Sequence, residues 1–282
     1  MNYRKVQLIL DQLKFKPKRS LGQNFLIDKN VLDKFITKSN ISSHDTILEI
    51  GPGLGALTER LIEKAKKLYA IEVDAILSKY LEDKFSTYKN IEIINGDVLT
   101  ADLPFHNKVI SNIPYTITGP ILEKIFFINE PPEGIMIIEK KIAKRIFSKG
   151  NYKNFSRITI GVTSFMNPIF MQDISPYSFY PTPKIEVSLI KIVPKENINQ
   201  FLLEESKKKF FLKFIAGIMP FKNKKMSNAL KLFFKNNKIR NFEKETIIEL
   251  LNRTDLDDNK VFSFKVEDLI QISKLIFNIS LK

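Results

Sequence analysis

Four consecutive residues, Asn112–Tyr115 (Asn-Ile-Pro-Tyr), carry the clearest chemical signal in this sequence. The side-chain carbonyl of Asn112 and the backbone carbonyl of Ile113 can accept hydrogen bonds from both N–H groups of an exocyclic amine such as that of adenine. Two such bonds pull the nitrogen toward tetrahedral geometry and free its lone pair. Pro114 stiffens the turn by holding φ at about −65°, and Tyr115 can stack on the base. The motif therefore predicts amine alkylation that relies on orientation and electrostatic placement.

A second aromatic face is offered by the loop Ser178–Lys184 (Ser-Phe-Tyr-Pro-Thr-Pro-Lys), which its two prolines stiffen. A target base in structured nucleic acid must be swung out of its stack before its amine can be reached. We predict that Phe179 holds such a base against Tyr115. Packing of Phe179 or Tyr180 in the hydrophobic core is the alternative.

A glycine-rich loop follows the first predicted strand, at Glu49–Ala56 (Glu-Ile-Gly-Pro-Gly-Leu-Gly-Ala). Glycines such as Gly51 and Gly53 let the backbone approach a ligand where a side chain would collide. Glu72, at the end of the second predicted strand, could accept hydrogen bonds from both hydroxyls of a ribose. The loop and the acid predict a nucleoside cofactor, and by themselves they fit a nicotinamide dinucleotide as well as S-adenosylmethionine.

The ends of the next two predicted strands favour S-adenosylmethionine. Asp97 follows the third strand and could accept a hydrogen bond from an adenine amine, and Asn112 follows the fourth. Ligands of open α/β sheets bind at these carboxyl ends. An NAD-dependent oxidoreductase would need an acid or base near the loop, and neither His44 nor His106 is suitably placed. With two histidines and no cysteine, we expect no metal site.

Short β-branched runs alternate with longer amphipathic segments between Thr46 and Val193, which predicts a doubly wound, mostly parallel Rossmann-like α/β sheet. The expected strands are Thr46–Ile50, Leu68–Val73, Ile91–Asn95, Lys108–Ser111 and Gly134–Ile138, followed by a late antiparallel strand at Ile185–Val193. The expected helices lie near 55–66, 75–87, 117–128 and 139–148. Two further short helices are expected around the basic loop Lys14–Asn24.

We place a domain boundary near Pro194, so that residues 1–194 form a catalytic domain with an N-terminal segment 1–45. Residues 195–282 form a smaller all-helical domain, because apolar residues recur there at spacings of three and four. The net charge of the chain is +14, and Lys207–Arg240 contains 11 basic residues and no acidic one. This concentration of positive charge predicts that the helical domain binds RNA phosphates.

The apolar run Val6–Leu10 is too short and too interrupted for a signal peptide, and no later run is long enough for a membrane span. The sequence therefore predicts a soluble, cytoplasmic protein that needs no membrane. We expect it to act as a monomer.

The chain resembles the kasugamycin-sensitivity family of rRNA adenine dimethyltransferases over nearly its whole length. The resemblance is carried by Lys18–Leu26, Glu49–Gly55, Asn112–Tyr115 and Phe179–Lys184. It implies dimethylation of the N6 amines of two adjacent adenosines in the 3′-terminal hairpin loop of 16S rRNA, within a small ribosomal subunit during its assembly. The cofactor residues expected for S-adenosylmethionine are Asn24, Leu26, Gly51, Gly53, Glu72, Asp97 and Asn112. The residues expected to contact RNA are Lys18, Arg19, Lys184, Lys222, Lys224 and Lys225.

Three segments depart from the family pattern, at Glu139–Lys141, at Ser156 and at Asn223–Lys225. None touches the Asn112 motif, but lysine does not reproduce the bidentate phosphate contact of arginine. A macrolide-resistance type of methyltransferase, acting on large-subunit rRNA, is the alternative within the enzyme class. A non-catalytic RNA-binding assembly factor is another, although Asn112 and the loop glycines are all present.

Overall fold

The computed structural model describes residues 1–148, 154–237, 244–252, 254 and 256–280. The chain divides into two compact units. The first contains Met1–Lys144 and Met166–Pro194, and the second contains Arg145–Phe165 and Lys195–Lys282. The second unit thus includes a segment, Arg145–Phe165, that the sequence analysis placed in the catalytic domain.

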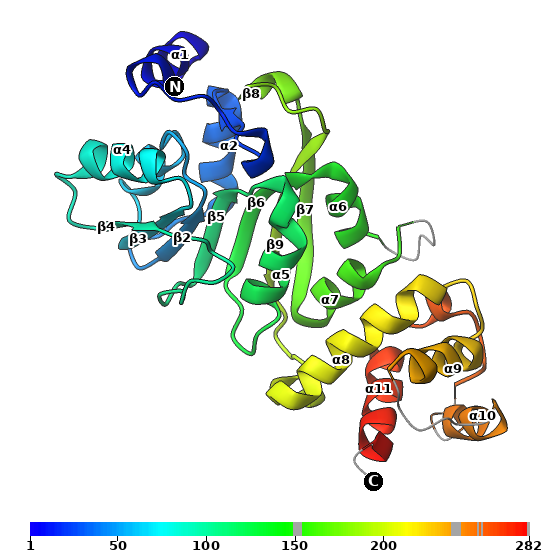
Figure 1. Cartoon of the computed structure of the whole chain (residues 1–282). Coiled ribbons are helices and arrows are strands. Elements are labelled where there is room, and N and C mark those ends of the chain that lie inside the picture. Colours follow the sequence, from blue (N-terminus) through cyan, green and yellow to red (C-terminus); the bar gives the residue numbers. More distant parts are fainter. Residues whose placement is uncertain (149–153, 238–243, 253, 255, 281–282) are drawn as a thin grey trace. The chain divides into compact units, whose positions relative to one another are not determined.

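The first unit is built on a seven-stranded sheet in the order β4-β3-β2-β5-β6-β9-β7 (Figure 1). Five strands are parallel, and β9 pairs antiparallel with both β6 and β7. The predicted α/β class and the late antiparallel strand are confirmed. In chain order the strands are β2 (Thr46–Ile50), β3 (Lys67–Glu72), β4 (Ile91–Asn95), β5 (Lys108–Asn112), β6 (Glu133–Glu139), β7 (Met166–Ile174) and β9 (Val187–Pro194).

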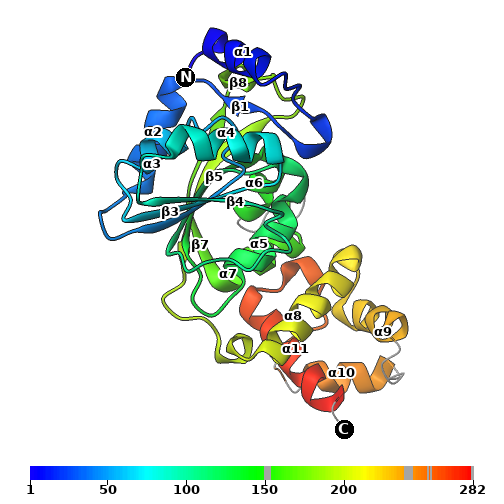
Figure 2. The same ribbon diagram turned by 60° about the vertical axis from the view of Figure 1, so that its left-hand side comes forward.

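Helices cover both faces of this sheet (Figure 2). They are α2 (Lys29–Ser39), α3 (Thr58–Leu61), α4 (Ala75–Phe85), α5 (Thr118–Phe126) and α6 (Lys140–Ile146). Residues of α2, α3 and α4 share one hydrophobic cluster with inward-facing strand residues such as Ile47 and Ile110. Asp28 and Asp74 begin α2 and α4 by accepting hydrogen bonds from exposed backbone N–H groups. Helix α3 is shorter than predicted, because turns of the glycine loop occupy the residues before it.

Two features of this unit were not predicted. Strand β7 forms the edge of the large sheet, and a two-stranded sheet pairs β1 (Phe25–Leu26) with β8 (Phe179–Tyr180). The small sheet joins the N-terminal segment to a loop more than 150 residues later, so no local pattern could reveal it. It is preceded by α1 (Tyr3–Gln12), which begins at an Asn2 cap.

The second unit is helical in its described residues. It contains α7 (Arg157–Phe165), α8 (Glu205–Ile218), α9 (Met226–Asn236), α10 (Lys244–Asn252) and α11 (Val266–Ser280). Phe214 and Phe233 meet edge to face with centroids 5.6 Å apart in its core. A Cβ at Gly217 would lie 2.4 Å from the Phe233 ring, so glycine permits the close approach of α8 and α9. None of the described helices in either unit is long and apolar enough to cross a membrane.

Candidate active site

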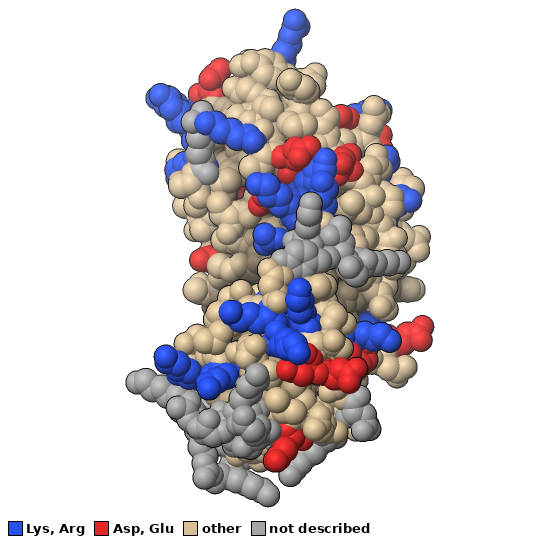
Figure 3. Space-filling view, turned by 90° about the vertical axis from the view of Figure 1, so that its right-hand side faces the viewer, with Lys and Arg blue, Asp and Glu red and all other residues tan. Residues whose placement is uncertain are grey.

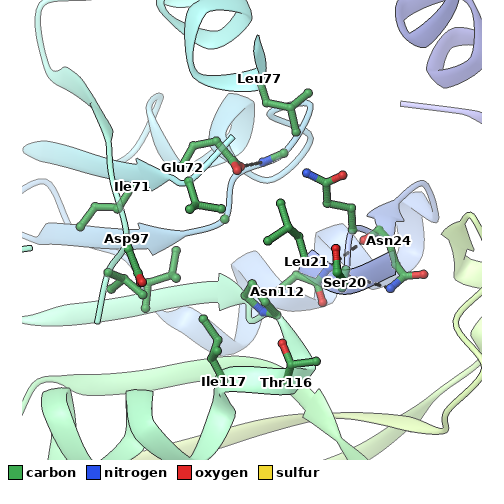
Figure 4. A pocket seen from close by; sticks show the side chains of 18 of the residues that line it. Ser20, Leu21, Asn24, Ile71, Glu72, Leu77, Asp97, Asn112, Thr116 and Ile117 are labelled. Atoms are coloured by element: carbon green, nitrogen blue, oxygen red, sulfur yellow. Dashed lines mark hydrogen bonds between the residues drawn. The ribbon is translucent and has the colours of Figure 1, made fainter. Parts of the chain in front are cut away.

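A pocket opens at the carboxyl ends of β2, β3, β4 and β5, in the first unit (Figure 4). Its floor and one wall come from the residues that end these strands, including Gly51, Glu72, Asp97 and Asn112. The opposite wall is the N-terminal loop Ser20–Phe25. The tertiary structure therefore brings together five separated segments of the sequence around one cavity.

The glycine loop leaves its strand in a backbone conformation that other residues rarely adopt. Gly51 and Gly53 have φ of 63° and 60°, within the left-handed region that favours glycine. A Cβ at Gly53 would lie 2.9 Å from the ring of Phe25, and one at Gly51 would lie 3.4 Å from Pro114. Both glycines thus meet a conformational requirement, and Gly53 meets a steric one as well. Together they keep the pocket wall free of side chains.

Glu72 is buried at the end of β3 and is 4% exposed. Its Oε2 accepts a hydrogen bond from the Gly53 N–H at 3.1 Å, and its Oε1 accepts one from the Asp74 N–H at 3.0 Å. Burial raises the pKa of Glu72, and these backbone hydrogen bonds oppose that shift. Carboxylate oxygens carry further lone pairs, so Glu72 can accept additional hydrogen bonds from a ligand.

Asp97 also lines the pocket, at the turn that follows β4, but it is exposed. Its Oδ1 accepts a hydrogen bond from the Leu99 N–H at 2.9 Å, which fixes the turn. Asp97 is therefore both the turn residue that its sequence context suggests and a carboxylate at the pocket rim.

Asn112 ends β5 with its side chain turned toward the N-terminal loop. Its Nδ2 donates to the backbone carbonyl of Asn24 at 3.1 Å, and this contact determines the orientation of the amide. Its Oδ1 is buried and has no hydrogen-bond donor within the described residues. A buried acceptor without a donor is costly and uncommon, so the side chain is poised to receive an N–H from a ligand.

The residues after Asn112 are held rigidly. Ile113 is fully buried, and its N–H donates to the Ile137 carbonyl at 3.1 Å. The Tyr115 hydroxyl is buried with no hydrogen-bond partner in the described part of the chain, and burial raises the pKa of Tyr115. The Tyr115 ring packs against the hydrophobic cluster of the first unit. Tyr115 is thus neutral at physiological pH and partly covered by the core.

Phe179 does not present the open face that the sequence analysis expected. Its side chain is 2% exposed and belongs to the hydrophobic cluster, and its backbone pairs with Leu26. Tyr180 packs edge to face on Tyr3, with ring centroids 4.9 Å apart. Phe179 therefore packs in the core of the first unit, whereas Tyr180, the next residue of β8, is half-buried and packs against a second hydrophobic cluster that contains Phe25 and Leu54.

The N-terminal loop is tied down at several points. Asn24 donates from Nδ2 to the Gly22 carbonyl at 2.9 Å, and Leu26 lines a small cavity beside the main pocket. Lys18, which we expected at the RNA surface, forms a 2.7 Å ion pair with the buried Asp74. The Arg19 side chain lies outside the described residues, and Lys184 is exposed.

Basic residues of the second unit differ in their contacts. Lys222 donates to the Phe155 carbonyl at 2.8 Å, whereas Lys224 and Lys225 are exposed. Three lysines at the start of α8 form ion pairs with glutamates of the same helix terminus: Lys207 with Glu204, and Lys208 and Lys209 with Glu205. Figure 3 shows blue side chains gathered on one face of this unit beside acidic ones.

Glu49 is a buried carboxyl group with a raised pKa that the sequence did not reveal. It is 2% exposed at the end of β2 and accepts a hydrogen bond from the Thr58 hydroxyl at 2.8 Å. Burial raises the pKa of Glu49 to about 8, and the nearby Glu72 charge adds to the shift. The sequence shows Glu49 at the start of the glycine motif. Its burial could not be predicted from the sequence, because it depends on the packing of α3, which contains Thr58.

Two of the three segments that depart from the family pattern contain a residue with side-chain contacts in the structure. Lys140 forms ion pairs with Asp173 and Glu186, each at 2.9 Å. Ser156 precedes α7, and its hydroxyl lies 3.2 Å from that of Thr159, in the position of a helix cap.

A family model for ribosomal RNA adenine dimethylase matches residues 14–271. The chain belongs to this family. Among similar members, a ribosomal RNA small subunit methyltransferase A from Borrelia garinii is 35% identical, over 95% of this chain and 92% of that protein. A probable counterpart from Thermococcus sibiricus is 32% identical over 99% of both. A solved dimethyladenosine transferase structure from Plasmodium falciparum superimposes with a TM-score of 0.73 at 25% identity, covering 91% of this chain and 98% of that one.

Proposed function

We propose that this protein transfers methyl groups from S-adenosylmethionine to the N6 amines of two adjacent adenosines in the 3′-terminal hairpin loop of small-subunit rRNA. Membership of the family supports the reaction class, and the names of its relatives support the small-subunit target. We place the reaction in the cytoplasm, on an assembling small subunit, and assign it to a monomer without a metal ion.

The observation that carries this proposal is the buried acceptor Asn112 Oδ1. It has no donor among the described residues, and its Nδ2 contact with Asn24 prevents the amide from turning to satisfy it otherwise. A target amine that donates one N–H to this oxygen would be oriented with its lone pair free. The neighbouring Ile113 is immobilised by burial and by its contact with β6, so its carbonyl can serve as the second acceptor.

The pocket residues support S-adenosylmethionine as the cofactor, because they include acceptors and a wall with little side-chain bulk. Glu72 is an acceptor for ribose hydroxyls, Asp97 is an acceptor for an adenine amine, and Gly51 and Gly53 leave room for close approach. When bound, this cofactor supplies a methyl group already activated on a sulfonium. The protein then needs only to orient the amine and exclude water.

Tyr115 is the aromatic residue we propose to contact the target base. It adjoins the pocket residues Pro114 and Thr116, and the charge-free phenol suits a stacking role. Phosphate contacts are assigned to the exposed Lys184, Lys224 and Lys225. Lys18 and Lys222 instead stabilise the protein through their contacts with Asp74 and Phe155.

The test is methyl transfer from labelled S-adenosylmethionine to small and large ribosomal subunits that lack the modification, followed by mapping of the labelled nucleotides. We expect dimethyladenosine at two neighbouring positions near the 3′ end of the small-subunit RNA. Label confined to large-subunit RNA would favour the macrolide-resistance activity. Subunit binding without any transfer would favour a non-catalytic assembly factor.

A further inference from the structure

Two buried polar atoms without a partner in the described residues belong to side chains that line the pocket, and they are chemically opposite. Asn112 Oδ1 is an acceptor, whereas Gln23 Nε2 is a donor. The first is used by the proposed reaction at the target amine. The second lies on the N-terminal loop, and none of the described residues provides an acceptor for it.

The orientation of the Gln23 amide is determined by its surroundings. Its Oε1 accepts a hydrogen bond from the Lys18 N–H at 2.7 Å, and its own backbone N–H donates to the Lys18 carbonyl at 3.4 Å. Because the Lys18 N–H can only donate, the oxygen of the amide must face it. The Nε2 of Gln23 is therefore held on the other side, where no acceptor from the described part of the chain satisfies it.

The same contacts place Gln23 on the Glu72 side of the pocket. The Lys18 ammonium forms a 2.7 Å ion pair with Asp74, whose side chain is 1% exposed. The Asp74 N–H in turn donates to Glu72 Oε1 at 3.0 Å. Gln23, Lys18, Asp74 and Glu72 thus form one connected chain of polar contacts, of which Gln23 and Glu72 line the pocket. It joins the N-terminal loop to the end of β3.

We infer that Gln23 and Glu72 form a donor–acceptor pair for the ribose diol of the cofactor. An ionised carboxylate can only accept hydrogen bonds, whereas a hydroxyl both donates and accepts. A ribose hydroxyl that donates to Glu72 keeps lone pairs that would be buried without a donor, and Gln23 Nε2 supplies one. Lys18 and Asp74 are positioning residues that hold the amide in place. This inference rests on the proposed cofactor.

The test measures binding of S-adenosylhomocysteine and its 2′-deoxy and 3′-deoxy analogues by titration calorimetry. In Gln23→Met, which removes the donor at similar length, the dissociation constant of S-adenosylhomocysteine should rise about tenfold, the scale of one hydrogen bond. The loss should disappear with the deoxy analogue that lacks the bonded hydroxyl. The matched control Gln12→Met changes an exposed glutamine of α1 and should bind all three ligands normally.

Gln23→Glu provides a second variant, because it keeps the acceptor for the Lys18 N–H and replaces the donor by a carboxylate oxygen, which also adds a negative charge. It should also bind S-adenosylhomocysteine more weakly, while the ligand-free thermal midpoint stays close to that of the unchanged protein. Unaltered binding in both variants would show that Gln23 does not contact the cofactor. An equal loss with all three ligands would overturn the ribose assignment. Failure of the unchanged protein to bind S-adenosylhomocysteine would instead refute the proposed cofactor.

Discussion

The pocket of the first unit and the basic segment Lys207–Arg240 of the second unit use polar residues in opposite ways. At the pocket, polar groups such as Glu72 and Asn112 Oδ1 are buried, and backbone contacts hold each in one orientation. In the described part of the basic segment, Lys224 and Lys225 stay exposed. Orienting a reacting amine requires atoms at fixed positions, whereas attraction of phosphates depends on charge and tolerates mobile side chains.

The largest effect should come from the pocket. Asn112→Ala removes the acceptor that orients the target amine, so we expect turnover to fall by about 10²–10³, as for other removed transition-state hydrogen bonds. RNA affinity and the thermal midpoint should be largely kept. Single-turnover methylation with saturating subunits and cofactor measures this effect. Near-normal turnover would show that Asn112 is not an acceptor for the amine.

A substitution at Glu49 tests whether burial keeps this carboxyl group protonated in the folded protein. In the unfolded chain its carboxyl loses a proton near its ordinary pKa of 4.5, while the folded protein retains the proton until about pH 8. The unfolding free energy therefore contains a contribution from Glu49 that is complete below pH 4.5 and is lost as the pH rises toward 8. Glu49→Gln should reduce the loss of stability between pH 5 and pH 8 by an amount on the order of 3 kcal/mol.

Urea unfolding of the original protein and Glu49→Gln at pH 5 and pH 8 provides this measurement. The variant keeps an oxygen that can accept from the Thr58 hydroxyl, so the comparison isolates the charge. The same pH dependence in both proteins would mean that Glu49 is ionised in the folded state.

The basic segment should show a smaller effect that depends on salt. Replacing Lys224 and Lys225 by Ala should weaken subunit binding several-fold and flatten the plot of log affinity against log salt by about 1.4–1.8, or about 0.7–0.9 for each phosphate contact. The control variant replaces the exposed Lys64 and Lys66 of the first unit. An unchanged slope in the Lys224 and Lys225 variant, or an equal change in the control, would argue against specific phosphate contacts.

The smallest effect should distinguish Lys222, which contacts the protein, from the exposed Lys224. Lys222 donates to the Phe155 carbonyl, so Lys222→Met should lower the stability of the protein by about 1 kcal/mol, the usual scale of a partly exposed hydrogen bond. The salt slope of subunit binding should not change. Thermal unfolding and the same salt titration measure both quantities. A flattened slope at preserved stability would instead make Lys222 a phosphate contact.

Local patterns in the sequence were sufficient for the parallel sheet and its motifs. The predicted bounds of β2 and β4 agree with the structure, and those of β5 differ by one residue. Strands β2 and β5 are buried runs that contain β-branched residues, whereas β4 at the edge of the sheet is only partly buried. Gly51 directly follows β2, and Asn112 is the last residue of β5. Because carboxyl ends of parallel strands meet at one edge, strand order alone brings these residues together.

Contacts between distant segments decided the rest. Phe179 lies in the core because β8 pairs with β1, and Arg145–Phe165 belongs to the second unit because α7 packs with its helices. The raised pKa of Glu49 depends on its burial beside α3. The orientation of the Gln23 amide depends on its hydrogen bond with Lys18. The types and spacing of the motif residues predict their chemistry. The exposure, charge state and orientation of each side chain depend on neighbours that only the folded chain brings together.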